Sequence, residues 1–318
     1  MLLPKPFRIR WRKHIMHLLL AVPAVSGAYT YAEVKRLEAA FPPNGQFVTV
    51  GGHKVHYVER GIGRPIVLMH GANSTAQDFV FSPIFDELAK THRVIAVDRP
   101  GYGYSERFIG AETPAAQARH LHAFLEQKNI EKPVLVGFSW SGALVASYAV
   151  QFPDSLTGLV VINGATHPWP LPDSWIDKAG NTPLLGELMA WTLTMPLGKA
   201  KIPGGVKRVF SPNPVPAWYG RIPMDMILRP GQFLANSTDM INLKSAAAAQ
   251  KDSYANITTP TVILVGEEDR VASPKIHSEP LHEAVKGSRL IRVKGAGHPL
   301  HHTHPAVVVS AIESLLSE

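Results

Sequence analysis

Short apolar runs recur along most of the chain and alternate with segments of helical periodicity. Runs that are apolar on both faces are typical of strands in a parallel sheet, which is covered by helices on both sides. Such runs predict strands at 65–69, 93–97, 133–136, 159–162, 261–265 and 290–293. The spacing of apolar residues predicts helices between them, at 115–128, 140–152 and 305–316. This alternation predicts an α/β fold with a mostly parallel central sheet and helices on both faces.

The predicted sheet opens with a hairpin and follows a cluster of helix-breaking residues. Segments 47–50 and 54–60 alternate around the Gly51-Gly52 turn, which favours two antiparallel strands. The preceding Pro-Pro-Asn-Gly sequence at 42–45 is typical of a boundary. We therefore predict one domain over 42–318, preceded by a separate segment at 1–41.

One interval interrupts the alternation of strands and helices. Between about 166 and 253 there is no strand-like run, but there are many prolines and apolar helical fragments. Four of the six Trp and five of the eight Met fall here, and such side chains line apolar ligand pockets as well as small cores. We interpret the interval as a helical cap inserted into the sheet domain.

The first 41 residues combine a basic run with an apolar stretch. Five Lys and Arg residues fall within positions 1–13, without an acid, and 15–32 is mostly apolar. This pattern predicts a signal-anchor that spans a cytoplasmic membrane once and leaves the folded domain on the extracytoplasmic side. A cleaved signal peptide, giving a periplasmic or secreted protein, is the alternative. A third interpretation is an ordinary amphipathic helix docked on the domain.

Composition narrows the possible functions. The net charge is +7, but the basic run at the N-terminus accounts for most of it, so no nucleic-acid partner is expected. The chain has no Cys, which excludes a thiol nucleophile, disulfides and thiolate-bound metals.

The candidate nucleophile is Ser139. It follows the strand predicted at 133–136 within Gly-Phe-Ser-Trp-Ser-Gly at 137–142, and an apolar helix comes next. A serine between small residues at a strand-to-helix turn is typical of a nucleophile elbow, where the helix N-terminus can stabilise an anion. Ser141 also has small neighbours, but in that register it would lie inside the helix.

A serine nucleophile needs a base and an acid that orients the base. His298 follows the strand predicted at 290–293, and Asp269 follows the one at 261–265, so both lie at carboxyl ends of strands. Glu267 and Glu268 are alternatives to Asp269. His301, His302 and His304 follow His298 and raise the alternative of a metal site, but no nearby carboxylate spacing supports it. We expect neither a metal nor another cofactor.

The oxyanion hole requires two backbone N–H groups. Trp140, directly after the candidate nucleophile, supplies one of them. Ala72, in the loop after the strand predicted at 65–69, is the candidate for the second. His70, in the same loop, is interpreted as a residue that braces it.

Residues from about 46 to 318 resemble the α/β-hydrolase superfamily, in its cap-bearing group. The motifs are HGAN at 70–73, DRPGYGYS at 98–105, GFSWSG at 137–142, GEEDRV at 266–271 and GAGH at 295–298. The order Ser139, Asp269, His298 is the one this resemblance implies. It also implies that Asp98 is a structural acid of a turn. Ser141 departs from the pattern, since the family mostly has Gly there.

The resemblance implies a serine hydrolase without a cofactor. Related dehalogenases and epoxide hydrolases use an Asp nucleophile, whereas this chain has Ser139. We expect hydrolysis of a lipophilic carboxylic ester, a small molecule, through an acyl-enzyme. The alternatives are a carbon–carbon or amide bond hydrolase with the same three residues, and a non-catalytic ligand receptor of the same fold.

Overall fold

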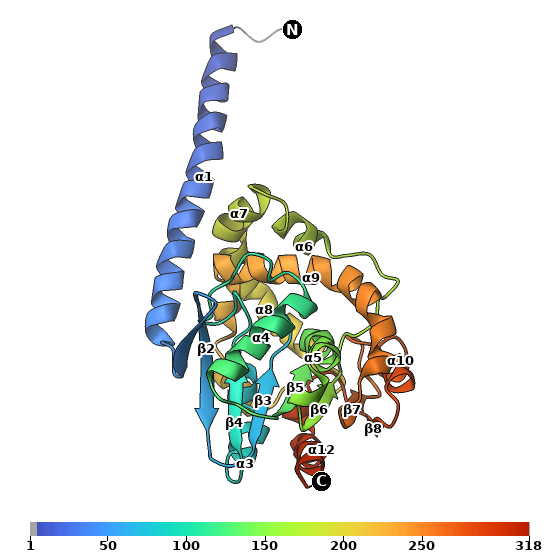
Figure 1. Cartoon of the computed structure of the whole chain (residues 1–318). Helices are drawn as coiled ribbons and strands as arrows, with labels where there is room; N and C mark the ends of the chain where they lie inside the picture. Colours follow the sequence, from blue (N-terminus) through green and yellow to red (C-terminus); the bar gives the residue numbers. More distant parts are fainter. Residues whose placement is uncertain (1–4, 318) are drawn as a thin grey trace.

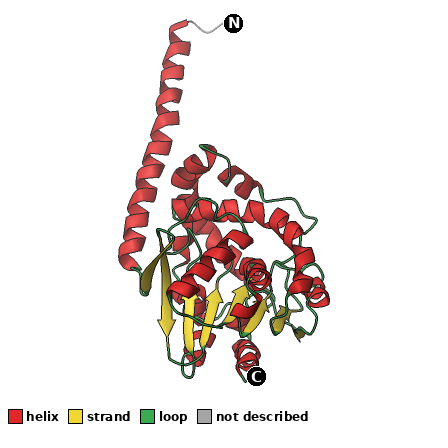
Figure 2. Ribbon diagram, viewed as in Figure 1, coloured by secondary structure: helices red, strands yellow, loops and turns green. Residues whose placement is uncertain are grey.

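The computed structural model describes residues 5–317, with side chains from residue 21 onward, and has an eight-stranded central sheet (Figures 1 and 2). The spatial order of strands is β1-β2-β4-β3-β5-β6-β7-β8, and the pairs from β4 to β8 are parallel. β1 and β2 form the antiparallel edge, and β2 is antiparallel to β4. The strands are β1 Gln46–Val50, β2 His53–Arg60, β3 Pro65–Met69, β4 Arg93–Val97, β5 Val134–Phe138, β6 Gly158–Ile162, β7 Thr261–Gly266 and β8 Arg289–Val293.

Helices cover both faces of the sheet because its inner strands are apolar on both sides. Along β3, Val67 and Met69 belong to one core, and Ile66 and Leu68 belong to the other. The first core is covered by α4 (Pro114–Gln127), α5 (Trp140–Gln151) and α10 (Ser278–Ala284). The second is covered by α2 (Gln77–Val80), α3 (Pro83–Leu88), α11 (Leu300–Thr303) and α12 (Pro305–Leu316). The predicted fold class is confirmed.

A helical cap lies between β6 and β7, as Figure 1 shows above the upper ends of the strands. It contains α6 (Trp175–Gly180), α7 (Leu185–Met189), α8 (Met195–Phe210) and the long α9 (Pro230–Gln250). Single-turn segments complete it: η2 (Ala190–Thr194), η3 (Ala217–Arg221), η4 (Met224–Leu228) and η5 (Lys251–Asn256). α9 crosses over the strand ends and brings cap residues to the loops after β3 and β4 (Figure 1).

The N-terminal segment forms one long helix, α1 (Lys5–Ala40), which extends beyond the body in Figure 1. Its later half packs on the cap. Leu37 is buried with Met195, Met226 and Leu228, and Glu33 forms an ion pair with Lys199 of α8. The basic side chains at 5–13 and the apolar ones at 15–20 lie outside the described side chains. The third interpretation, a helix docked on the domain, therefore describes the later half of α1.

The predicted membrane anchor is wrong. In the part of the chain that the structure describes, no helix combines the length and the apolarity needed to cross a bilayer. The apolar stretch is interrupted by Pro23 and Ser26, and α1 continues into a charged segment that is paired with the cap. The predicted membrane partner and the predicted localisation, at a cytoplasmic membrane or beyond it, rested on this segment. Both predictions are therefore wrong as well.

Candidate active site

Ser139 lies on the turn between β5 and α5, at φ 55° and ψ −118°. A positive φ is strained for a residue with a side chain and is typical of functional sites. Small neighbours make this turn possible. A Cβ on Gly137 would lie 2.5 Å from the Ser141 carbonyl oxygen, and a Cβ on Gly71 would lie 3.0 Å from the Ser139 Cβ. α5 begins directly after Ser139, so its free N–H groups lie next to the hydroxyl.

Ser141, the alternative in the sequence, lies inside α5 and is fully buried. Its hydroxyl donates a hydrogen bond to the carbonyl oxygen of His70. Ser141 therefore braces the loop after β3, and Ser139 is the serine on the turn.

His298 and Asp269 form a buried pair at the ends of β8 and β7. The distance from His298 Nδ1 to Asp269 Oδ2 is 2.7 Å, and both residues are at most 5% exposed. The other carboxylate oxygen of Asp269 accepts the N–H groups of Val271 at 2.7 Å and Ala272 at 3.1 Å. These two bonds fix the orientation of the Asp269 carboxylate. Because Nδ1 of His298 faces that carboxylate, Nε2 is the ring nitrogen that can act as a base. The alternatives Glu267 and Glu268 are exposed.

Asn163, which the sequence analysis did not single out, holds the loop that carries His298. It follows β6 at φ 44°, a conformation that Asn tolerates better than most residues. Its Nδ2 donates to the carbonyl oxygens of Gly297 and His298, and its Oδ1 accepts the N–H of Gly266. One amide therefore connects β6, the end of β7 and the loop of the candidate base.

The two candidate oxyanion donors lie on either side of Ser139. Trp140 is the first residue of α5, so its N–H has no partner within the helix. Among the described residues, no acceptor takes the N–H of Ala72 either. His70 braces the loop, since its Nδ1 lies 2.8 Å from the Gly71 carbonyl oxygen and its Nε2 accepts the N–H of Arg99. Burial and the charge of Arg99 lower the pKa of His70 to about 4, so the ring is neutral near pH 7.

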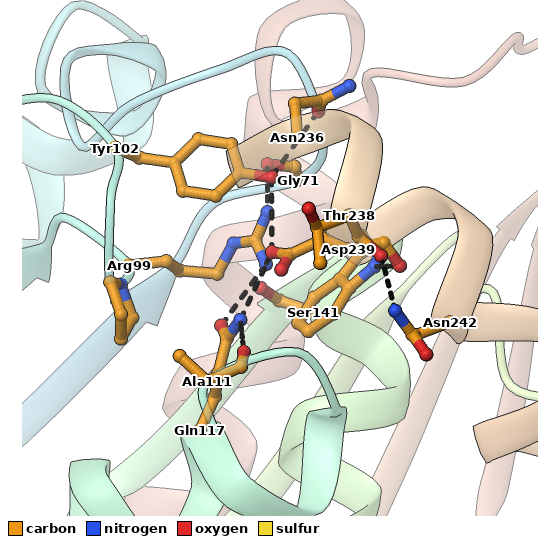
Figure 3. Close-up of polar contacts among 12 residues, drawn as sticks. Gly71, Arg99, Tyr102, Ala111, Gln117, Ser141, Asn236, Thr238, Asp239 and Asn242 are labelled. Carbon is orange, nitrogen blue, oxygen red and sulfur yellow. Dashed lines mark hydrogen bonds and ion pairs between the residues drawn. The ribbon is translucent and has the colours of Figure 1, made fainter. Parts of the chain in front are cut away.

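A buried charged cluster joins the cap to the same loops (Figure 3). Arg99 follows β4, Asp239 lies on α9, and both side chains are fully buried. Arg99 Nη1 lies 2.9 Å from Asp239 Oδ2, and Arg107 Nη2 lies 2.8 Å from Asp239 Oδ1. The hydroxyl of Tyr102 and Nε2 of Gln117 also donate to Asp239. Local sequence patterns do not reveal that Arg99 and Asp239 meet, because they are 140 residues apart in the chain.

A second buried cluster lies behind the candidate base. Asp78 of α2 accepts from His301 Nε2 at 3.1 Å and from His302 Nε2 at 3.0 Å. The nearby carboxylate that the sequence analysis did not find is thus supplied from 223 residues away. Trp218 Nε1 donates to Nδ1 of His302, which places the ring proton on Nε2. The ligand atoms of Asp78, His301 and His302 also lie within 4.8 Å of one another, so these three buried residues form a hydrogen-bonded network that could hold a metal ion.

A cavity of about 250 Å³ opens between the end of α1, the loop before α2 and the cap. Its wall is mainly apolar and includes Phe41, Phe81, Tyr104, Pro223 and Met226. The wall also contains Thr75, three residues after Ala72. Ser139 and His298 do not line it.

The comparisons with known proteins agree with this architecture. Residues 64–305 match the model of the alpha/beta hydrolase fold family, and the chain belongs to that family. The cis-3-alkyl-4-alkyloxetan-2-one decarboxylase of Shewanella oneidensis is 28% identical over 259 residues, which cover 74% of this chain and 76% of the relative.

Two solved structures share the fold. An esterase from Exiguobacterium antarcticum superposes with a TM-score of 0.71 at 18% identity, over 86% of this chain and 100% of that one. A meta-cleavage product hydrolase from Pseudomonas fluorescens superposes with a TM-score of 0.66 at 20% identity, over 86% and 97% of the two chains. Proteins named as an esterase and as a meta-cleavage product hydrolase thus share the fold of this chain.

Proposed function

We propose that this chain is a serine hydrolase that cleaves carboxylic esters of apolar substrates through an acyl-enzyme. The proposal rests mainly on the buried pair of His298 and Asp269, in which Nδ1 lies 2.7 Å from Oδ2. The pair follows the carboxyl ends of β8 and β7, and Ser139 follows the carboxyl end of β5 on a strained turn before α5. A serine, an imidazole and a fixed carboxylate are the parts that acyl transfer requires.

In the proposed reaction, Ser139 attacks the ester carbonyl while His298 takes its proton. Asp269 holds His298 in the tautomer that leaves Nε2 free to act as the base. The N–H groups of Ala72 and Trp140 stabilise the negative charge that develops on the carbonyl oxygen. His298 then returns the proton to the leaving alcohol, and a water activated by His298 releases the acid from Ser139.

A cyclic ester is a second candidate substrate. The oxetan-2-one named for the Shewanella relative is a four-membered lactone that carries two alkyl chains, so its carbonyl is also an ester carbonyl. The cap contains four of the six Trp and five of the eight Met, and such side chains support alkyl substituents rather than charged ones. The likeness to a meta-cleavage product hydrolase keeps carbon–carbon cleavage as the competing reaction.

Substitution of the two serines tests the mechanism. Ser139→Ala should reduce turnover of nitrophenyl esters to the level without enzyme, because the acyl-enzyme can no longer form. Ser141→Ala, two residues further on, is the matched control and should keep measurable turnover. The substrates to be tested should include nitrophenyl esters with acyl chains of 2 to about 12 carbons, a dialkyl oxetan-2-one and a vinylogous 1,5-diketone. These compounds form the substrate panel.

Labelling separates an enzyme from a ligand receptor. A fluorophosphonate should modify wild-type protein at Ser139, which mass spectrometry of the peptide would identify. Labelling without turnover of any panel member would contradict the proposed hydrolysis and favour a receptor. An active Ser139→Ala variant together with an inactive Ser141→Ala variant would contradict the assignment of the nucleophile.

A further inference from the structure

We propose that Arg99 is a positioning residue of the oxyanion hole and that it depends on Asp239 of the cap. The inference rests on the proposed function, because it concerns the N–H groups of Ala72 and Trp140. In this proposal, the cap helix α9 contributes to the oxyanion hole as well as covering the site. Through one buried ion pair it fixes the backbone that is meant to stabilise the transition state.

The first step is the position of the Arg99 guanidinium. It is fully buried, and it lies between two aromatic rings, 4.2 Å from the centroid of Tyr102 and 3.9 Å from that of Trp140. Nη1 donates hydrogen bonds to Oδ2 of Asp239 and to Oε1 of Gln117. Nη2 donates to the carbonyl oxygen of Gly71 at 3.3 Å. The side chain thus contacts both loops that carry the candidate oxyanion donors.

The second step follows from the planarity of the peptide bond. The carbonyl of Gly71 and the N–H of Ala72 belong to one trans peptide unit, so they point in opposite directions. A donor that holds the Gly71 carbonyl therefore also fixes the direction of the Ala72 N–H. Arg99 Nη2 and His70 Nδ1 both hold that carbonyl. If either bond is lost, the peptide plane gains freedom to rotate.

The third step concerns Trp140. Its ring carries the Arg99 guanidinium on one face, and its Nε1 donates to the backbone carbonyl oxygen of Asp239 at 3.3 Å. The side chain of Trp140 is therefore held by Arg99, which also holds the Gly71 carbonyl, and by the backbone of Asp239. Because Trp140 follows Ser139 directly, a shift of its side chain would move the backbone N–H beside the nucleophile.

The position of Arg99 depends on the cap. An arginine buried without a counter-ion is unfavourable, and Asp239 supplies the negative charge from α9. Neighbouring contacts support the same docking, since Asn236 Oδ1 accepts the N–H of Asn73 at 2.8 Å. When α9 is displaced, Arg99 loses the carboxylate that neutralises its charge, and Gln117 and the Gly71 carbonyl oxygen remain as neutral acceptors. The oxyanion hole is thus complete only with the cap in place.

Three variants test this chain of contacts. Arg99→Met keeps the length of the side chain but removes the donor to Gly71, and Asp239→Asn keeps the shape but removes the charge that holds Arg99. Arg99→Lys keeps a charge for Asp239, but an ammonium lacks the planar fork that reaches Asp239 and Gly71 together. We expect kcat for esters to fall about 10- to 100-fold in all three, with KM changed less than threefold.

Arg107→Gln is the matched control. Arg107 bonds the other carboxylate oxygen of Asp239 but contacts neither Gly71 nor Trp140. If the cluster had only a structural role, substitution of Arg107 and substitution of Arg99 would lower kcat to a similar extent. We expect Arg107→Gln to keep kcat within about threefold of wild type. Circular dichroism and thermal unfolding of each variant would show that it is folded.

A second readout and a second variant keep the test decisive. The rate constant for phosphonylation of Ser139 should fall in parallel with kcat, because that reaction also develops charge on the oxygen. If the single variants do not fold, Arg99→Met/Asp239→Leu replaces the pair by apolar groups, which restores packing without restoring the donor. Wild-type kcat and labelling in a folded Arg99 variant, or equal losses in Arg107→Gln, would overturn the inference. Lack of ester turnover by a wild type that is still labelled would instead overturn the proposed function, and the labelling rates would still decide the role of Arg99.

Discussion

Individual polar side chains in this protein act mainly by fixing backbone. Asn163 holds the loop of His298, Ser141 holds the carbonyl of His70, and Arg99 with His70 holds the carbonyl of Gly71. A backbone group that is held by two buried donors keeps one orientation, and that is what an oxyanion hole needs. The residues that touch the substrate in the proposed reaction are therefore only part of the site.

His70 gives a prediction about pH. Burial and Arg99 lower its pKa from 6.5 to about 4 in the folded protein, so the unfolded chain binds the proton more readily. The contribution of this neutral ring to stability is complete above about pH 6.5 and is lost as the pH falls towards 4. Protonation would also replace the acceptor of the Arg99 N–H by a donor. We expect the free energy of unfolding to fall between pH 7 and pH 4.5.

Urea unfolding at several pH values measures this effect. His70→Gln should show a smaller loss over the same interval, although its stability at pH 7 is lower. His53→Gln, at the start of β2, is the control and should follow the wild-type pH dependence. The same pH dependence in wild type and His70→Gln would show that another group is responsible.

At the scale of elements, α1 is a part of the cap's packing. Leu37 is 2% exposed against Met195, Met226 and Leu228, all from the cap, and Glu38 pairs with Arg229 at the start of α9. Leu37→Ala should lower the free energy of unfolding by about 2–4 kcal/mol, because it leaves a cavity between α1 and the cap. Chemical denaturation followed by circular dichroism would measure it.

Lys35→Ala is the control for that substitution. Lys35 lies on the same helix, two residues earlier, with a side chain that is 62% exposed, so its loss should change stability by less than about 0.5 kcal/mol. Equal effects of the two substitutions would show that α1 does not pack on the cap in solution.

The elements differ in how far the sequence predicts them. β3 to β7 are predictable because each is a short, mainly apolar run that is buried on both faces, a property that a strand carries by itself. β8, at the edge of the sheet, has a weaker pattern with two arginines. The segment at 15–32 is also apolar by itself, and that property suggested a bilayer. Its later part contacts cap residues such as Thr192, which accepts a hydrogen bond from Ser26 over 166 positions in the chain, and local composition does not reveal such a contact.

The same limit applies to the candidate site. The motifs around Ser139, Asp269 and His298 are local, and sequence alone located them. The pairs Arg99–Asp239 and Asp78–His301 join positions 140 and 223 residues apart, and nothing in the local sequence links the two partners of either pair. Buried polar pairs of this kind become visible only when the fold brings distant loops together.

At the scale of the whole molecule, cap and sheet domain are joined by polar contacts that are buried rather than exposed. Arg99 and Asp239 are both inaccessible, and Gln232 of α9 bridges the N–H of Gly103 and the carbonyl oxygen of Ser74. Opening the cap alone would leave a buried arginine without its counter-ion, which is costly. The cap and the sheet domain should therefore unfold together in one cooperative transition.

Two probes can test this single transition, since the tryptophans are unevenly distributed. Four of the six lie in the cap, so tryptophan fluorescence reports mainly on the cap, whereas far-ultraviolet circular dichroism reports on the whole fold. In wild type the two curves should coincide along a urea gradient. In Asp239→Asn, where the cap loses its charged attachment, fluorescence should change at a lower urea concentration than circular dichroism. Separate curves in wild type would mean that the cap opens independently, and the buried pair would then not be what holds it on the sheet domain.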